Sequence, residues 1–425
     1  MENTPASMLQ FIIMQEEKFP WSAIYIGTIF SLLVLGIAYY FMAPGEGNFF
    51  SEERTEKITE FSNSFVSGRK DGNKVWSFFV AEGWTGKGHE VSSLTNLSQG
   101  KIYSDGKLVA TNISAPFAKT YRHSEIIELY GFFPNQQGGS SKLTALIELG
   151  RISNNKDKAK NEWRKLTADR LKHFPWDKRS EIIGNVVLSR KDNSLHAQSI
   201  NVDHEKKIAD LTGNIAIVRS DSTLKTEGLR YLTTEEVLTT TKEITLEVRE
   251  AETTTILEAK GAEFYSDLDK DITFENGVEV LQGKKFAIAN QAIYSQKSKV
   301  MLLKGKAKIV FEKANIIIKE ETANKLKNPE SQKSLKEKTI ITADQLTFST
   351  TTGDLKAAGS VFAYQQGKEA KSDTAIYNEK DEFITLTGNV YIKKKTDWVK
   401  AKKVIISVKD ETFEAVGGVE AEFKL

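Results

Sequence analysis

One short pattern of residues recurs from residue 168 onward, and it constrains the fold more than any other feature of the chain. Each copy starts with a small residue and reaches a Gly 16 positions later, with apolar and polar residues alternating around the Gly. The six clearest copies run from Ala168 to Gly184, Ala197 to Gly213, Ala289 to Gly305, Ala343 to Gly359, Ser372 to Gly388 and Ala401 to Gly417. Most neighbouring glycines are 29 positions apart. Such a period predicts a supersecondary unit that buries its apolar face by stacking on the next copy.

Each copy is predicted to form two β-strands, the second of which bends at its Gly. Leu386, Gly388 and Val390 occupy alternate positions and share one apolar face, whereas Thr387 and Asn389 take the other face. A Gly within an otherwise good strand lowers its stability, so it predicts a bend or a close approach of two backbones. The pattern therefore predicts an all-β fold, an elongated antiparallel tube or trough built from repeats of about 29 residues around a continuous apolar interior.

Two stretches interrupt the repeat and are predicted to be inserted loops or degenerate copies of the repeat. Pro134–Glu162 contains a Gly-Gly-Ser-Ser run, and Lys319–Lys338 contains six lysines and four glutamates. Segments of this composition bury little apolar surface. We therefore expect both stretches to lie outside the apolar interior.

Trp21–Ala43 is predicted to be a transmembrane helix. It runs for 23 residues without a charge, which is long enough to cross a hydrocarbon core of about 30 Å. Aromatic residues near both ends of the segment are typical of membrane interfaces. A cleaved signal peptide and a buried soluble helix are the alternatives, but the apolar run is long for a signal peptide and Lys18 is the only base nearby. We expect an uncleaved anchor.

The charges and the chemically reactive residues exclude several classes of function. Lys and Arg number 59 against 57 Asp and Glu, and the two signs are interspersed, so nucleic acid is not an expected partner. There is no Cys, and the five His form no zinc-binding motif. The chain also lacks a nucleophile-elbow motif and a phosphate-binding loop. We therefore expect no enzyme activity, no cofactor and no metal.

Two smaller patterns of polar residues have structural interpretations. Asp169, Asp344 and Asp373 recur at one position of the repeat, which favours a turn or capping role over paired catalytic carboxylates. His196 and His204 are eight positions apart, and we interpret them as a pair on the surface rather than as metal ligands.

Two segments of the repeat carry a family resemblance: TADQLTFSTTTGDLKAAGSVFAY and KSDTAIYNEKDEFITLTGNVYIKK. They resemble the OstA-like repeat of lipopolysaccharide transport proteins of the LptA and LptC type. The anchor followed by the aromatic strand KVWSFFVAEGW is similar to the LptC arrangement, and the remainder is similar to an LptA-type domain. The resemblance divides the chain into a short cytoplasmic segment 1–20, the anchor 21–43, a linker 44–72, an LptC-like first β-jellyroll 73–162 with an inserted loop, and an LptA/OstA-like repeat domain 163–425 with the charged insertion 319–338.

The resemblance implies a periplasmic carrier anchored in the inner membrane by a single span, with its C-terminal domain in the periplasm. Acyl chains of lipopolysaccharide, or of a similar glycolipid, would lie in an apolar β-trough on the way from an inner-membrane ABC transporter toward the outer membrane. The strand edge at the end of the sequence would dock another OstA-like bridge protein or an outer-membrane assembly protein by β-strand augmentation.

A second class of function also fits the repeat, an anchored β-solenoid scaffold or adhesin with a fully packed interior. The small inward residues Ala307, Ala357 and Ala363 leave room for a ligand and so favour the carrier.

Inward apolar positions in the middle of each domain are the candidate lipid contacts, although any closed β-sandwich also buries alternate positions by packing alone. The candidates are Phe79, Ile127, Leu129, Phe133, Leu211, Ile215, Phe274, Val278, Leu303, Ile309, Leu386 and Val390.

Overall fold

The computed structural model describes residues 57–86, 88–134, 142–148, 163–190, 193–250, 253–265, 270–283, 285–312, 329–334, 336–407, 409–410 and 412–424. All of them belong to one compact unit, Glu56–Leu425. Among these residues no helix is long and apolar enough to cross a membrane. The predicted anchor Trp21–Ala43 lies outside the described residues, as do parts of both predicted insertions.

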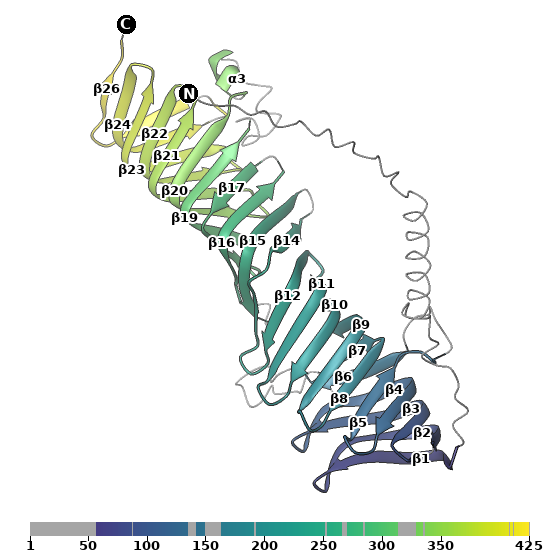
Figure 1. Ribbon diagram of the computed structural model, residues 1–425. Coiled ribbons are helices and arrows are strands. Elements are labelled where there is room, and N and C mark those ends of the chain that lie inside the picture. Colours follow the sequence, from purple (N-terminus) through teal and green to yellow (C-terminus); the bar gives the residue numbers. More distant parts are fainter. Residues whose placement is uncertain are drawn as a thin grey trace, which may run out of the picture. The chain divides into compact units, whose positions relative to one another are not determined.

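The described chain is almost entirely β-structure (Figure 1). Its N-terminal strands are β1 (Thr59–Lys70), β2 (Asn73–Thr85), β3 (Val91–Ser104), β4 (Lys107–Tyr121), β5 (Ile126–Tyr130), β6 (Leu143–Glu148), β7 (Trp163–Ala168), β8 (Arg170–Phe174) and β9 (Arg179–Arg190). The next strands are β10 (Asn193–Asp203), β11 (Ile208–Val218), β12 (Ser222–Leu232), β13 (Val237–Thr240), β14 (Ile244–Arg249), β15 (Thr254–Tyr265), β16 (Ile272–Gln282), β17 (Lys285–Ala289), β18 (Gln291–Ser295) and β19 (Val300–Phe311). After the short helix α3 (Pro329–Ser334) follow β20 (Thr339–Ser349), β21 (Leu355–Gln365), β22 (Lys368–Asn378), β23 (Phe383–Lys394), β24 (Asp397–Ser407), β25 (Thr412–Val416) and β26 (Glu420–Glu422).

The strands pair antiparallel with their neighbours in the sequence, so the ladder advances steadily from β1 to β26. Some positions of the ladder hold one long strand and others hold two short strands end to end. β9, for example, pairs with both β7 and β8 on one edge and with β10 on the other. The all-β class expected from the sequence is confirmed. In the first predicted insertion, Leu143–Glu148 forms β6 and pairs with β4 and β7, which favours a degenerate repeat over an inserted loop for this part.

A β-bulge interrupts β9, β11, β19, β21 and β23 near their middle, at the Gly of the repeat. Between β23 and β24 the register shifts between Thr387 and Val390, so Gly388 and Asn389 are left out of the ladder. Both residues have left-handed backbones, with φ of 80° and 46°. Gly adopts this conformation without a steric penalty, and Asn tolerates it better than most residues. The bend expected at the Gly is therefore present.

The Asp that recurs in the repeat caps this bulge. Asn389 Nδ2 donates to Asp373 Oδ2 at 3.0 Å, and Asn185 Nδ2 donates to Asp169 Oδ2 at 2.7 Å in an earlier copy. The carboxylate thus holds the left-handed residue beside it in place. The capping role expected for these Asp residues is confirmed in both copies.

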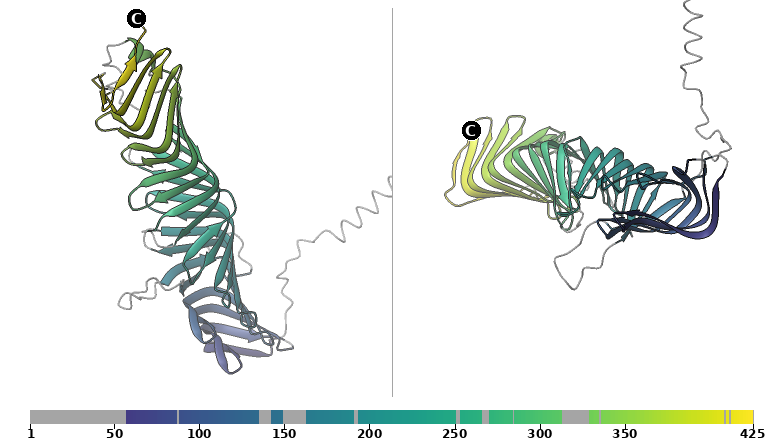
Figure 2. Two further views of the ribbon diagram at one scale, coloured as in Figure 1. Left: turned by 90° about the vertical axis from the view of Figure 1, so that its left-hand side faces the viewer. Right: turned by 60° about the horizontal axis from the view of Figure 1, so that its bottom comes forward.

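Each bulge turns its strand, and the two halves of the strand form two walls that face one another (Figure 2). We call the space between the walls the trough. Inward side chains from both walls form one buried cluster that extends from β2 to β21, and a second cluster centred on Leu386 and Val404 continues in β23 and β24. The predicted apolar interior is this pair of clusters.

The bulge predicts a difference between two glycine substitutions. Gly388 and Gly367 have nearly the same φ, 80° and 78°, but a Cβ on Gly388 would collide with Asp373, whereas nothing lies within 4 Å of a Cβ on Gly367. We expect Gly367→Ala to lower the free energy of unfolding by about 1 kcal/mol through backbone strain alone. Gly388→Ala should lower it by about 1–3 kcal/mol more. Denaturant unfolding of both variants measures the difference, and equal losses would contradict the capping role of Asp373.

Candidate functional site

An apolar cavity of about 70 Å³ lies in the trough among the C-terminal strands. Of its lining residues, only Gln282, Lys285 and Tyr377 carry polar side-chain atoms. One wall contributes Val280, Ala287 and Ile309, and the facing wall contributes Phe348, Leu355 and Ile384.

The cavity shows that the two halves of one strand face each other. Ile341 and Phe348 both belong to β20, on opposite sides of the bulge between Thr342 and Gln345, and both line the cavity. A straight strand could not bring them to the same space, because seven residues of extended chain span more than 20 Å. The cavity is therefore a section of the trough that side chains leave unfilled.

The unfilled section has an energetic cost in the absence of a ligand. The apolar side chains that line it lack packing partners on the side of the unfilled space. Protein interiors contain few such voids, and an apolar lining does not favour water. The chemistry of the cavity matches that of a hydrocarbon chain.

Side chains bridge the two walls above the cavity, along a line that we call the seam. Lys285 Nζ, at the end of one wall, lies 3.6 Å from Glu379 Oε2 on the other wall. Gln282 Nε2 donates to the carbonyl oxygen of Thr350 at 3.4 Å, again from wall to wall. In each of these contacts at least one of the two groups belongs to a side chain. Within each wall, by contrast, backbone hydrogen bonds join the strands.

The same kind of contact recurs along the seam closer to the N-terminus. Asp221 and Lys299 form an ion pair from wall to wall, and Lys178 Nζ lies 3.3 Å from Asp105 Oδ1. Burial raises the pKa of Asp221, but the hydrogen bond and the charge of Lys299, with hydrogen bonds from Ser222 and the backbone, leave this pKa below its ordinary value. The ionised form of Asp221 is therefore the one that the seam stabilises.

A second cavity, of about 370 Å³, lies among the N-terminal strands. Its floor is apolar and includes Ile102, Leu171 and Ile182, and its rim carries charged groups such as Lys178 and Glu205. The volume falls within the range of small-molecule sites, roughly 300–1,000 Å³. Unlike the first cavity, this one is amphipathic.

Two histidines and a serine form a hydrogen-bonded chain at this second cavity. Ser180 Oγ lies 2.9 Å from His173 Nδ1 and 2.8 Å from His204 Nε2, so the hydroxyl can donate to one ring and accept from the other. Burial, followed by the charge of His204, lowers the pKa of His173 to about 3. Burial likewise lowers the pKa of His204. Both rings are therefore neutral near pH 7.

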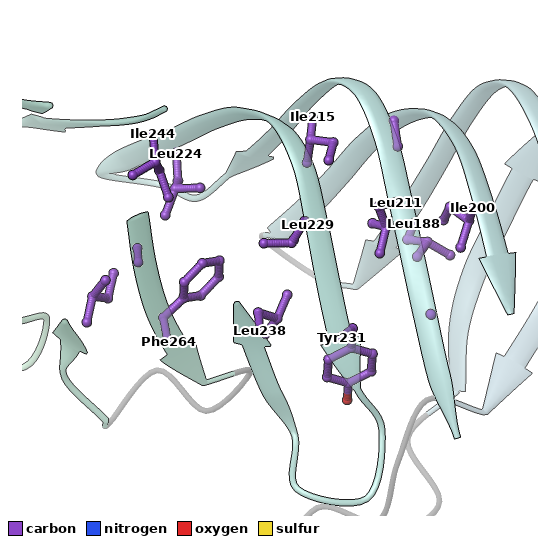
Figure 3. Close-up of a cluster of buried hydrophobic side chains, with 14 of the residues drawn as sticks. Leu188, Ile200, Leu211, Ile215, Leu224, Leu229, Tyr231, Leu238, Ile244 and Phe264 are labelled. Atoms are coloured by element: carbon purple, nitrogen blue, oxygen red, sulfur yellow. The ribbon is translucent and has the colours of Figure 1, made fainter. Parts of the chain in front are cut away.

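Between the two cavities lies a section of the trough whose inward side chains are buried (Figure 3), and we call it the packed section. The buried side chains there include Leu211, Ile215, Leu229 and Phe264, which come from strands β11, β12 and β15 and point into the same space. These four residues line neither of the two cavities.

Ten of the twelve candidate residues are buried in the trough. They are Ile127, Leu129, Leu211, Ile215, Phe274, Val278, Leu303, Ile309, Leu386 and Val390. Ile309 lines the apolar cavity, whereas Leu211 and Ile215 belong to the packed section of Figure 3. Contact of these residues with a lipid stays a prediction.

The other two candidates differ from the expectation of an inward, buried position. Phe79 is only partly buried and packs against the exposed ring of Phe65, with ring centroids 5.3 Å apart, because its neighbours Phe78 and Val80 take the inward face. Phe133 lies just after β5 and is also only partly buried.

Sequence reasoning missed several residues of both cavities. Ile341, Phe348 and Leu355 were not candidates, although the alternation of apolar residues in β20 and β21 marks them as inward. The interpretation of His196 and His204 as a pair was wrong. His196 is exposed and bonds to Ser194, whereas His204 turns toward Ser180 and His173. Within the described ranges, no group of three or more His, Asp or Glu could hold a metal ion.

The fold and the site define a class of protein, an antiparallel β-trough with a bulge in each long strand and an apolar interior. The family model described as LptA/(LptD N-terminal domain) LPS transport protein matches residues 196–329 and 331–412, just over half of the chain. The chain belongs to this family, and its role lies in the transport of lipopolysaccharide.

Two further comparisons do not add to this assignment. A crystal structure of LptH, the LptA homologous periplasmic component of the lipopolysaccharide transport device from Pseudomonas aeruginosa, is similar over 27% of this chain and 82% of its own. The identity is 14% and the TM-score is 0.24. No curated protein matches the chain.

The histidine chain predicts how stability depends on pH. The pKa of His173 is lowered in the folded state, so between pH 6.5 and 5 the unfolded state binds the extra proton and stability falls as the pH falls. We expect His173 to account for a loss of about 2 kcal/mol over this range. His173→Asn, which places a hydrogen-bonding amide near the position of Nδ1, should remove that part of the pH dependence. His196→Asn, at an exposed ring, is the control, and equal pH profiles for both variants in urea unfolding would contradict the assignment.

Proposed function

We propose that this chain carries lipopolysaccharide, or a similar glycolipid, by enclosing its acyl chains in the trough. The apolar cavity between Ile309 and Phe348 carries this proposal, because it offers a hydrocarbon chain a space that the protein does not fill itself. Membership of a lipopolysaccharide transport family supports the choice of lipid.

The seam supports entry of a lipid from the side. The contacts named above between the walls are made by side chains, and each is worth little in partly exposed positions, typically about 1 kcal/mol or less for an exposed ion pair. The ladder along each wall is a continuous series of backbone hydrogen bonds. The walls can therefore separate at the seam while the ladder stays intact, and the sugar head group can stay outside.

The wider role that we propose is that of an anchored bridge. Trp21–Ala43 would hold the chain in the inner membrane by a single span, next to an ABC transporter, with the trough in the periplasm. Residues 73–162 would form a first, LptC-like jellyroll, and residues 163–425 an LptA/OstA-like domain built on repeats of about 29 residues. The support is the uncharged apolar run of this segment and the family to which the remainder belongs.

The alternative function, a scaffold or adhesin, fits the unfilled sections of the trough less well. A structural β-solenoid is stabilised by a dry, closely packed core, and the apolar cavity departs from such packing. A cavity would lower the stability of such a core and would contribute nothing to the function of a scaffold. We therefore favour the carrier.

A photo-crosslinking residue at the cavity tests the carrier role. We expect a probe at Ile309, which lines the cavity, to capture lipopolysaccharide in cells, because its side chain faces the trough. The same probe at the next residue, Val310, should capture none, because alternate side chains point outward. Capture from both positions to the same extent, or from neither, would contradict the proposal. Mass spectrometry of the adduct identifies the lipid.

The proposal also includes docking of a further trough on the edge formed by β25 and β26. Among the described strands these two pair only with β24, so their other edge is open. Phe413 lies opposite Ile406 on the inward face and is 49% exposed. A docked sheet would cover this ring and continue the apolar interior.

A single substitution tests this docking. We expect Phe413→Glu to weaken association between copies of the chain by about tenfold or more, because burial of a Phe side chain contributes roughly 1.5–3 kcal/mol. Glu414→Gln, on the outward face of β25, should leave association unchanged and serves as the control. Sedimentation measures both. A wild-type chain that stays monomeric, or a Phe413→Glu chain that associates normally, would contradict docking between copies at this edge.

A further inference from the structure

Among the described residues that line the apolar cavity, Lys285 is the one with a cationic side chain. It begins β17, opposite Gln282 of β16 and Phe311 of β19, where the wall reaches the seam. Its side chain is only 20% exposed. The ammonium group therefore lies where the apolar interior meets the outside.

The acidic partner of Lys285 is held loosely. The distance of 3.6 Å between Lys285 Nζ and Glu379 Oε2 is longer than a hydrogen bond. Glu379 Oε2 is itself buried and has no hydrogen-bond partner among the residues that the structure describes. Neither group has its bonding capacity satisfied by the other, so an anion that bonds to the ammonium group directly would displace Glu379 at little cost.

Asp354 adds a second carboxylate to the same wall. The backbone N–H of Glu379 donates to Asp354 Oδ1 at 2.9 Å, which ties the turn after β22 to the turn before β21. Glu379 remains anchored by its backbone when its carboxylate leaves Lys285. The exchange of partners therefore requires a rotation of one side chain rather than a change in the wall.

From this geometry we propose that Lys285 binds the anionic head group of the lipid, a phosphate or a carboxylate, while the acyl chain next to that group occupies the cavity. The inference rests on the proposed function and adds to it the residue that selects lipids with an anionic head group. Lipid binding replaces a loose ion pair with a charge-assisted hydrogen bond and fills the apolar void. An acyl lipid with a neutral head group would fill the void but would form no charge-assisted hydrogen bond with Lys285.

Lys178, one of the lysines that line the amphipathic cavity, offers a comparison. Lys178 Nζ lies 3.3 Å from both Asp105 and Glu205, and these two partners raise its pKa. An incoming anion would have to replace two hydrogen-bonded carboxylates there. Lys285, with one loosely held partner, is therefore easier for an anion to bind than Lys178.

The test compares two photoactivatable lipids with the same acyl chain, a lysophosphatidic acid and a monoacylglycerol, titrated onto the full chain in membrane vesicles. We expect Lys285→Gln to weaken capture of the lysophosphatidic acid by about tenfold, since a hydrogen bond to a charged group is worth roughly 1.5–3 kcal/mol. Capture of the monoacylglycerol should not change. Lys285→Arg should restore capture of the anionic lipid, and Glu379→Gln should strengthen it.

Lys308→Gln, at an outward lysine of β19, is the matched control and should bind both lipids like the wild type. Loss of both lipids to the same extent in Lys285→Gln, or of neither, would overturn the role of Lys285 while leaving the trough as a carrier of acyl chains. Competition by inorganic phosphate as effective as that by the lysophosphatidic acid would show a site for free anions and would also overturn it. Failure of the wild type to capture either lipid would overturn the proposed function together with this inference.

Discussion

The bulge in the middle of the long strands is the constraint on which the rest of the structure depends. At Gly388 and Asn389 two successive residues take left-handed backbones and leave the ladder, and the carboxylate of Asp373 holds Asn389 in place. Repetition of this bend turns a single antiparallel ladder into two facing walls. The apolar face of the strands, which would otherwise be exposed, becomes the interior of the trough.

The two walls are joined differently on their two sides. At the bulges the chain itself runs from one wall to the other, and within each wall backbone hydrogen bonds join neighbouring strands. At the seam, pairs such as Asp221 with Lys299 and Lys285 with Glu379 hold them through side chains. Side-chain contacts break at a much smaller cost in free energy than a ladder does, so the seam is the side on which such a structure opens.

The interior is filled unevenly, and this unevenness follows from residue size. Phe264 and Phe274 are buried in the middle of the trough, whereas the small residues Ala287 and Ala375 line the apolar cavity from opposite walls. The open section has a charged lysine at its edge and apolar side chains behind it. A lipid with an anionic head group matches this arrangement, because its charged group is at one end and its apolar chain lies behind it.

The sequence by itself determined the local features of this protein. The alternation around Leu386, Gly388 and Val390 established which face is inward and where the strand bends, because both follow from the two-residue period of a strand and the backbone of Gly. Ten of the twelve candidate residues are buried for the same reason. Only the tertiary structure decided which of them meet a cavity. Ile341 and Phe348 meet because of the bend, Lys285 meets Glu379 across the seam, and His204 meets His173 through Ser180. These contacts depend on how far each wall is offset from the wall that faces it, and that offset follows from the packing of all the repeats together rather than from any one of them.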